Sequence, residues 1–223
     1  ISIQAMDYLD DWDYNLDPHS TAAAIYVAFE DELKRQMNDW LVPDKAKGMI
    51  TIQMKRVIDF LVYPDSKFGD NAISGRDEFL LKCFINAILE LSEKYGSSMK
   101  KWTYGGTHYK HITLKHPMSN AVTDEVRVKL EVGPAPRGGN AYTVNMTSGN
   151  LNQRSGGSFK IISDTGNWDH TLATNTPGQN GNPDHPHYRN LFELWARDQY
   201  FPLFYSKKKI EGVKSEVWRL KAN

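Results

Sequence analysis

The period with which apolar residues recur changes near residue 100 of this chain, and this change limits the possible folds more than any other feature. Up to about residue 100, apolar side chains recur at the spacing of an amphipathic helix. From about Trp102 they recur at every second position, which is the period of a strand with one buried face. The sequence therefore predicts an α+β protein, mainly helical over 1–100, with a mostly antiparallel sheet, loops and a C-terminal helix over 101–223.

Two helices are predicted by apolar stripes early in the chain. One covers 21–40, and Asp17-Pro18 before it has the residue types of a helix start, an acidic N-cap followed by proline. The other covers 50–61 and stops before Pro64, because proline cannot continue the hydrogen bonding of a helix.

A third helix has signals at both ends. Its apolar stripe runs through 80–95, and Gly96 directly after it is a typical C-terminal stop. Ser74 and Asp77 stand ahead of the stripe in a capping-box pattern. Cys83 lies on the stripe, so we expect a buried thiol rather than a catalytic one. As the single cysteine of the chain, it also excludes an internal disulfide and a cysteine-based metal cluster.

Strands are predicted where the alternation is regular. Residues 125–132 alternate without fault between apolar and charged side chains. Residues 142–146 form a second candidate strand, 159–161 a third, and 171–176 a shorter fourth. Loops rich in glycine, proline and asparagine separate them.

The C-terminal part returns to a helical pattern. Residues 188–197 fit a last helix, with Leu191, Leu194 and Trp195 on its inner side. A polar, charged helix is expected to follow from Lys207.

Composition limits the classes of partner. Lysine plus arginine and aspartate plus glutamate both number 27, so the formal net charge is zero, and the one basic run is 207–209. A nucleic-acid binder carries a basic excess, and a membrane span needs about 20 consecutive apolar residues, which this chain lacks. We therefore expect neither nucleic acid nor membrane as a partner. The chain begins at Ile1 without a signal peptide, which favours a processed product or a cut fragment.

Histidine clusters suggest metal binding but fit it poorly. His108, His111 and His116 lie close in sequence, yet in a strand His108 and His111 would face opposite sides, and no HExxH motif is present. Solvated or hydrogen-bonded histidines explain this cluster better than a metal site. Asp184, His185 and His187 precede a helix, where capping of the helix start is the favoured interpretation. No metal or other cofactor is therefore predicted.

Two further patterns resemble catalytic or binding motifs. Ser155, Asp169 and His170 could compose a Ser-His-Asp triad, but no G-x-S-x-G elbow holds the serine. The run 137–140 (RGGN) resembles a phosphate-binding loop, but it leads into a predicted strand and so lacks the helix N-terminus that would hold an anion. A tight bend is favoured instead, with Gly138 or Gly139 in a backbone conformation that disfavours a Cβ.

Several short segments stand out because of their order. They are, from the N-terminus, Trp12-Asp13-Tyr14 ahead of an alanine-rich helix; Trp102, Gly105, His108 and His116-Pro117; 137–145 (RGGNAYTVN); 155–160 (SGGSFK) and Asp169; 177–181 (PGQNG); Pro186-His187-Tyr188; and Leu194-Trp195 leading to 200–203 (YFPL). This series resembles the C-terminal part of the large chain in the penicillin amidase (penicillin acylase) family. Asn180 stands where that family more often has serine.

The resemblance implies an N-terminal-nucleophile hydrolase. In such enzymes a precursor cleaves itself, and the new N-terminal Ser, Thr or Cys attacks an amide carbonyl with its own α-amine as the base. An α-amine has a pKa of about 8, so much of it is neutral near physiological pH. The implied fold is a four-layer αββα sandwich, of which this chain would be a part.

The resemblance also implies that the catalytic residues lie elsewhere. Ile1 has no nucleophilic side chain, and the nitrogen of Ser2 is in a peptide bond. The nucleophile, the oxyanion-hole asparagine and the substrate-pocket aromatics belong to upstream sequence in this family, so no catalytic, substrate-binding or metal-ligating residue is assigned to this chain.

These inferences define one leading function and one alternative. The leading expectation is a C-terminal structural portion of an amidohydrolase that cleaves linear amide bonds of penicillin or N-acyl-homoserine-lactone type. Its partners would be the small chain and the remaining large-chain segments of the same precursor, and its substrate would be a small-molecule amide. The family resemblance implies a periplasmic or extracellular location. The alternative is a non-catalytic binding or assembly module that reuses the fold.

Overall fold

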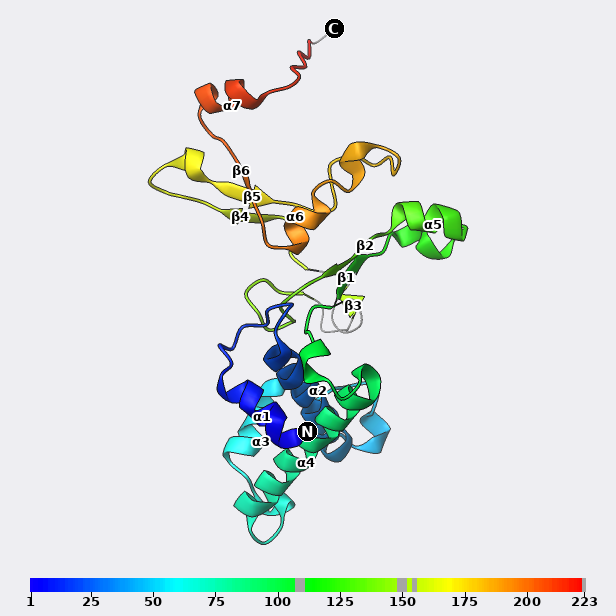
Figure 1. Cartoon of the computed structure of the whole chain (residues 1–223), viewed down its shortest axis with the longest axis vertical. Coiled ribbons are helices and arrows are strands. Elements are labelled where there is room, and N and C mark those ends of the chain that lie inside the picture. The colour runs from blue at the N-terminus through cyan, green and yellow to red at the C-terminus, as the bar shows by residue number, and fades with distance from the viewer. Residues whose placement is uncertain (107–110, 148–151, 154–155, 222–223) are drawn as a thin grey trace. The chain divides into compact units, whose positions relative to one another are not determined.

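The structure, a computed structural model, describes residues 1–106, 111–147, 152–153 and 156–221. It divides into two units, which we call unit 1 (Ile1–Gly105) and unit 2 (Gly106–Asn223). Helices form the regular structure of unit 1, whereas unit 2 combines short strands with short helices (Figure 1). The predicted α+β class is confirmed. Within the part of the chain that the structure describes, no helix is both long enough and apolar enough to cross a membrane.

Two long helices pack against each other in unit 1. They are α2 (Thr21–Leu41) and α4 (Ala72–Tyr95), and the shorter α1 (Ser2–Asp10) contacts both (Figure 1). Helix α3 (Met54–Val62) packs on α2. Single 3₁₀ turns occupy Asp44–Ala46 (η1), Ser66–Phe68 (η2) and Met99–Lys101 (η3).

The core of unit 1 lies where α2, α3 and α4 meet. One cluster of buried side chains joins all three helices: Leu33, Met37, Val57, Phe60 and Cys83. The thiol of Cys83 is buried, as expected, and burial raises its pKa to about 11. A buried carboxylate also joins α2 to α4, because Asn86 Nδ2 donates to Glu32 Oε1 at 3.1 Å.

Two predicted N-cap residues are wrong by a few positions. Helix α2 begins at Thr21, and Ser20 rather than Asp17 caps it by accepting from the Ala23 N–H at 3.1 Å. Helix α4 begins at Ala72, and Asn71 rather than Ser74 is its N-cap. Serine, aspartate and asparagine all cap helices, so sequence alone left several candidates within one turn.

The other helix limits in unit 1 follow the sequence more closely. Helix α3 starts at Met54, later than the predicted residue 50, and ends ahead of Pro64 as expected. Gly96 ends α4 with φ of 82°, in the left-handed region that glycine adopts without strain.

Unit 2 holds two small sheets. In the first, β1 (His111–Leu114) lies between β2 (Val132–Pro136), which is antiparallel to it, and β3 (Asn152–Gln153), which is parallel. In the second, β5 (Leu172–Thr174) lies between β4 (Lys160–Ile162) and β6 (Phe201–Pro202), both antiparallel. Strands were therefore predicted correctly near 159–161 and 171–176.

The helices of unit 2 are short. They are α5 (Asp124–Leu130), α6 (Phe192–Ala196) and α7 (Lys207–Val213), with 3₁₀ turns at Pro117–Asn120 (η4), Trp168–His170 (η5) and Pro186–Tyr188 (η6). Helix α7 confirms the polar helix expected from Lys207. The core of the unit brings α6 onto the first sheet through Ile112, Val132, Ala135, Tyr188, Phe192, Trp195 and Ala196.

The predicted strand over 125–132 is wrong, because most of this segment is helix α5. Asp124 and Glu125 lie in its first turn and Arg127 and Lys129 in its last, which is the order that the helix dipole favours. Alternation produces a strand only when neighbouring strands accept its backbone hydrogen bonds, and here β2 starts only at Val132, the last residue of the alternating run.

The predicted strand over 142–146 is also wrong, because this segment turns back on itself. The Asn140 carbonyl accepts from the Thr147 N–H at 3.1 Å, and the Asn140 side chain accepts from the Tyr142 N–H at 2.8 Å. Local side-chain bonds of this kind compete with sheet pairing. Tyr142, Val144 and Met146 are all exposed.

The predicted helix over 188–197 is two separate turns, η6 and α6. The Leu191 N–H donates to the Pro177 carbonyl at 3.0 Å, which takes it out of a continuous helix. As a result, α6 buries Phe192, Trp195 and Ala196, whereas Leu191 and Leu194 stay partly exposed. Of the three residues predicted on the inner face, Trp195 alone is buried.

Candidate functional site

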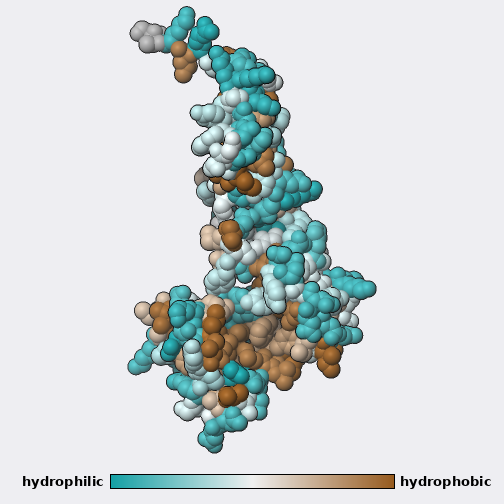
Figure 2. All heavy atoms as spheres, turned by 90° about the vertical axis from the view of Figure 1, so that its left-hand side faces the viewer, coloured by the Kyte–Doolittle hydropathy of each residue, from teal (hydrophilic) through white to brown (hydrophobic). Residues whose placement is uncertain are grey.

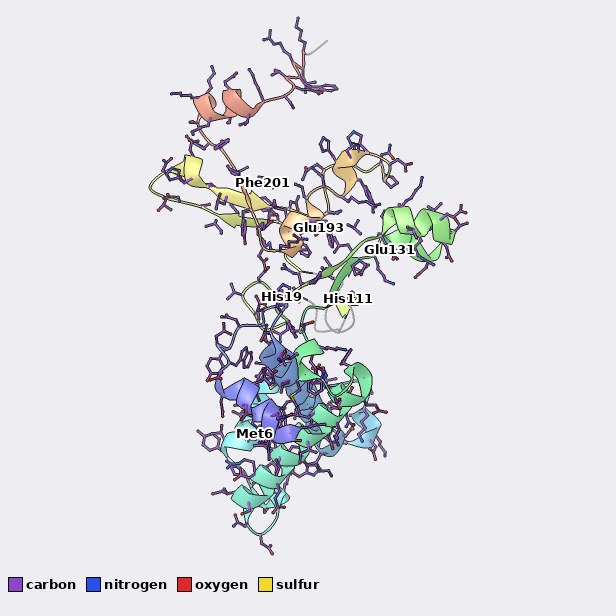
Figure 3. The ribbon with its side chains drawn as sticks, in the orientation of Figure 1. Met6, His19, His111, Glu131, Glu193 and Phe201 are labelled. Atoms are coloured by element: carbon purple, nitrogen blue, oxygen red, sulfur yellow. The ribbon has the colours of Figure 1, made fainter. Side chains whose placement is uncertain are left out.

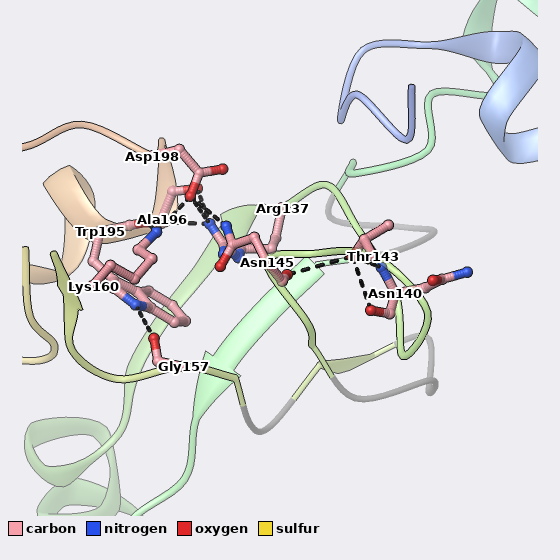
Figure 4. Close-up of polar contacts among 9 residues, drawn as sticks. All are labelled: Arg137, Asn140, Thr143, Asn145, Gly157, Lys160, Trp195, Ala196 and Asp198. Carbon is pink, nitrogen blue, oxygen red and sulfur yellow. Dashed lines mark hydrogen bonds and ion pairs between the residues drawn. The ribbon is translucent and has the colours of Figure 1, made fainter. Parts of the chain in front are cut away.

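The most highly bonded polar cluster in unit 2 centres on Arg137, which follows β2 and is 1% exposed. Its Nη1 donates to the Trp195 and Ala196 carbonyls, both at 3.1 Å, and to Asp198 Oδ1 at 3.0 Å (Figure 4). The two carbonyls belong to the last turn of α6, where a cation is favourable. Arg137 therefore ties the end of β2 to the end of α6.

The ring of Trp195 packs against the Arg137 guanidinium of this cluster. Trp195 is 1% exposed, its ring lies 4.5 Å from the Arg137 guanidinium carbon, and its Nε1 donates to the Gly157 carbonyl at 2.8 Å. A guanidinium over an indole face is a favourable cation–π contact. Nε and Nη2 of Arg137 are buried and have no hydrogen-bond acceptor among the described residues, so the ring is the main contact of this side of the guanidinium.

Asp198 accepts hydrogen bonds from three side chains of the cluster. Its Oδ1 accepts from Arg137, from Lys160 at the start of β4, and from Asn145 Nδ2 at 2.6 Å (Figure 4). Its backbone φ is 52°, a left-handed conformation that a non-glycine residue rarely adopts without support.

The charges of the cluster shift two pKa values. Burial would raise the pKa of Asp198, but the hydrogen bond from Lys160 and the charge of Arg137 outweigh it, so the pKa is lowered. Burial lowers the pKa of Lys160, and its bond to Asp198 opposes this shift only in part. Two cations and one carboxylate thus stabilise each other and hold β2, β4 and α6 together. No nucleophile is paired with a base here, so this is a structural cluster.

The RGGN run is a tight bend, as predicted. Gly139 has φ of 76°, and a Cβ there would lie 2.8 Å from Thr143 Oγ1. Thr143 Oγ1 in turn accepts from the Asn140 N–H at 3.1 Å and donates to the Asn140 carbonyl at 3.0 Å. The run leads into a turn rather than a helix, so it does not form a phosphate-binding loop.

Of the first histidine cluster, the structure describes His111 and His116. His111 stands at the start of β1 (Figure 3), and His108 lies outside the described residues. His116 Nδ1 accepts from the Met118 N–H at 3.1 Å and so caps η4. Over the described ranges, no three His, Cys, Asp or Glu side chains are grouped as metal ligands would be.

The second histidine cluster caps a helix, as expected. His185 Nδ1 accepts from the His187 N–H at 3.1 Å at the start of η6. Asp184 forms a 2.9 Å ion pair with Lys129 of α5. These contacts fasten the turn before α6 and leave no group poised for chemistry.

The possible triad is not assembled by the residues that can be seen. Ser155 lies outside the described residues. Asp169 Oδ1 accepts from the Tyr205 and Ser206 N–H groups at 2.9 and 2.7 Å, and these bonds, led by Ser206, lower the pKa of Asp169. His170 bonds instead to Asp164, at 3.3 Å. Asp169 therefore positions the chain before α7.

A surface hollow of about 570 Å³ in unit 1 was not predicted from the sequence. Its walls come from the end of α1, the loop after it and the start of α2: Asp7, Tyr8, Asp11, Trp12, Asp13, Ser20, Thr21 and Ala22. The hydroxyl of Ser20 caps α2, and that of Thr21 donates to the Met99 carbonyl at 3.3 Å. The one sequence signal for the hollow is the Trp12-Asp13 pair. The hollow is lined by carboxylates and aromatic rings, and among its lining residues no nucleophile is paired with a base.

Comparison with known proteins gives matches of three kinds. The family model described as penicillin amidase matches residues 2–212. The acyl-homoserine lactone acylases QuiP of Pseudomonas aeruginosa and Pseudomonas fluorescens strain Pf0-1 are 25% and 28% identical over 94% and 86% of this chain. A thermostable penicillin G acylase from Alcaligenes faecalis has a similar fold, with a TM-score of 0.50 at 17% identity, over 100% of this chain and 43% of that one.

The matches also differ greatly in length from this chain. It spans 28% and 24% of the two acyl-homoserine lactone acylases. The similarity therefore covers about a quarter of each of these two acylases.

Proposed function

Because the chain belongs to the penicillin amidase family, we propose that it is the C-terminal structural portion of an amidohydrolase that cleaves linear amide bonds. The match over residues 2–212 is the observation that carries the proposal. The two acyl-homoserine lactone acylases support amides of that class as the first substrates to test. Penicillin-type amides are the second class.

The proposal assigns this chain a supporting role. The polar cluster of Arg137, Lys160 and Asp198 joins β2, β4 and α6 through its hydrogen bonds and ion pairs. Asp169, His116 and His185 each hold a turn or a helix start. Side chains that look catalytic in the sequence thus have structural partners where they are described.

The chemistry is proposed to lie on a segment of the precursor outside these 223 residues. An N-terminal nucleophile needs its attacking oxygen or sulfur and its free α-amine on the same residue. The chain spans 28% and 24% of the two acyl-homoserine lactone acylases, so most of a precursor of that length is available to supply this residue. The remaining segments of the precursor, the small chain and the N-terminal part of the large chain, are proposed as the partners that bring these groups.

The proposal includes a location. A periplasmic or extracellular enzyme is expected, and cell fractionation with an antibody to the chain tests it. Recovery of the mature protein with the cytosolic marker would contradict this part of the proposal.

The experiment that tests the function uses the complete precursor. We expect the purified, processed protein to release amine from N-acyl-homoserine lactones or from phenylacetyl amides, and mass spectrometry to find a Ser, Thr or Cys at a newly formed N-terminus. Replacement of that residue by alanine should abolish turnover. A complete protein that folds, is not cleaved and hydrolyses neither class would support the alternative, a non-catalytic binding or assembly module.

A further inference from the structure

We propose that the exposed apolar side of α4, formed by Leu81, Ile85 and Leu89, is the surface on which a helix from another segment of the same precursor packs. The inference rests on the proposed function, in which further segments complete the enzyme. It adds the place on unit 1 where one of them binds. We call these three residues the α4 ridge.

Helix α4 is apolar on two adjoining sides. The buried side consists of Cys83, Phe84, Ala87, Ile88 and Leu91. The α4 ridge is exposed, with 55% of Leu81, 36% of Ile85 and 57% of Leu89 accessible to solvent. Since seven residues make about two helical turns, Leu81 and Ile88 point in nearly the same direction. The ridge therefore begins where the buried side ends, and the apolar arc of α4 is wider than the part that unit 1 covers.

A helix with so wide an apolar arc is typical of a buried helix rather than a surface one. Single exposed apolar residues are ordinary, but a contiguous set marks an interaction surface. Figure 2 shows that apolar side chains, in brown, gather on the surface of unit 1 in the lower part of the view. Within unit 1 the exposed large apolar residues also include Ile3 and Met6 of α1 and Ile58 and Val62 of α3.

The spacing of the ridge indicates a helix as its partner. Residues at i, i+4 and i+8 form a continuous ridge, and such ridges pack into the grooves of a second helix. From Leu81 to Leu89 the ridge is about 12 Å long, which matches about two turns of a partner helix. Glu78 and Lys82, both exposed, border it with charge, as expected at the rim of an interface.

The length of the relatives indicates where this helix comes from. The chain spans 28% of the Pseudomonas aeruginosa acylase, so most of the polypeptide of that relative has no counterpart among these residues. Under the proposed function, the corresponding segments of the precursor surround unit 1. A second copy of the chain is the competing occupant, and the experiment below separates the two.

The test measures how fast a cysteine on the ridge is alkylated in the complete, processed enzyme. Cys83→Ala provides the background, because Cys83 falls in the same tryptic peptide (83–94) as the labelled positions. Leu89→Cys reports on the ridge. Glu90→Cys is the matched control. Glu90 is the next residue after Leu89, it is exposed, and it points away from the ridge.

We expect Leu89→Cys to be labelled at least about tenfold more slowly than Glu90→Cys in the folded enzyme, and both at similar rates after unfolding. Equal rates in the folded enzyme would overturn the proposal. A photo-reactive phenylalanine analogue at position 85 should cross-link to a helix elsewhere in the same molecule. Cross-links between two copies, with protection that rises with protein concentration, would overturn it as well.

The result is separable from the proposed function. Amide hydrolysis by the same preparation tests the function, whereas labelling and cross-linking test the surface. Active enzyme with a fully reactive ridge cysteine would reject the surface alone. Inactive protein with a protected ridge would reject the function alone.

Discussion

The guanidinium of Arg137 lies 4.5 Å from the centre of the Trp195 ring and donates to the Trp195 backbone carbonyl at 3.1 Å. The two residues are 58 positions apart in the sequence. Trp195 thus contacts the same cation through its ring and through its main chain, and its Nε1 adds a bond to Gly157. This pair joins the end of β2 to the end of α6.

Trp195→Ala should destabilise the protein by about 3–5 kcal/mol, because it removes a fully buried aromatic side chain from the core and leaves a cavity. Urea unfolding of the purified chain measures the change. Trp218→Ala is the matched control, since Trp218 is 83% exposed and should alter stability by less than about 0.5 kcal/mol. A Trp195→Ala variant within about 1 kcal/mol of the parent would mean that this face is not packed.

Asp198→Asn should make the free energy of unfolding less dependent on pH in the acidic range. The folded-state pKa of Asp198 lies below its unfolded value, so its stabilising effect is present above the unfolded pKa of about 4 and is lost as the pH falls through the folded pKa. We expect the variant to be less stable than the parent at pH 7 and to approach it at pH 3.

Urea midpoints at both pH values measure this effect. Asp70→Asn serves as the control, because Asp70 is an exposed carboxylate of unit 1 and lies outside the cluster of Arg137, Lys160 and Asp198. A parent and an Asp198→Asn variant with the same midpoint at pH 7 would show that the bonds from Arg137 and Lys160 do not stabilise the fold.

Gly139→Ala should destabilise the bend by about 1–3 kcal/mol, since φ of 76° is unfavourable with a Cβ and the new atom would lie 2.8 Å from Thr143 Oγ1. Gly181→Ala is the control, because no atom lies within 4 Å of its added Cβ. In a Thr143→Ala background the added Gly139→Ala should cost less than in the parent, because the clash with Oγ1 is gone and the part due to φ remains. Thermal unfolding with no difference between the Gly139→Ala and Gly181→Ala variants would contradict the assigned conformation.

The isolated 223-residue polypeptide should have no amidase activity on phenylacetyl, aliphatic or acyl-homoserine-lactone amides. In this polypeptide the free α-amine belongs to Ile1, which has no nucleophilic side chain. The oxyanion-hole donor expected on upstream sequence is also missing, and loss of one such donor alone typically costs about 10²–10³ in rate. Release of amine from a chromogenic amide, with purity checked by mass spectrometry, measures this. Turnover that is abolished by changing His108, His116 or Ser155 would refute the proposed function.

Local patterns in the sequence predicted the elements whose stability is itself local. Helices α2 and α4 are long, so many apolar positions repeat at the helical period and Gly96 marks an end, and both were predicted to within a few residues. The tight bend at Gly139 was also predicted, because glycine pairs in this setting favour a positive φ. The ordered motifs were sufficient to predict the family.

Elements that depend on distant partners could not be read in this way. Residues 125–132 and 142–146 alternate like strands, yet most of the first segment is helix α5 and the second is a turn held by hydrogen bonds to Asn140. Nothing near Arg137 in the sequence indicates that Asp198, 61 positions later, accepts a hydrogen bond from its guanidinium. A cation, a carboxylate and an indole gain from one another only when folding removes them from water together. Local patterns in this chain therefore predict the long helices α2 and α4, the bend and the family, whereas strand pairing and the meeting of distant charges depend on tertiary structure, because those energies arise between residues that the chain brings together only when it folds.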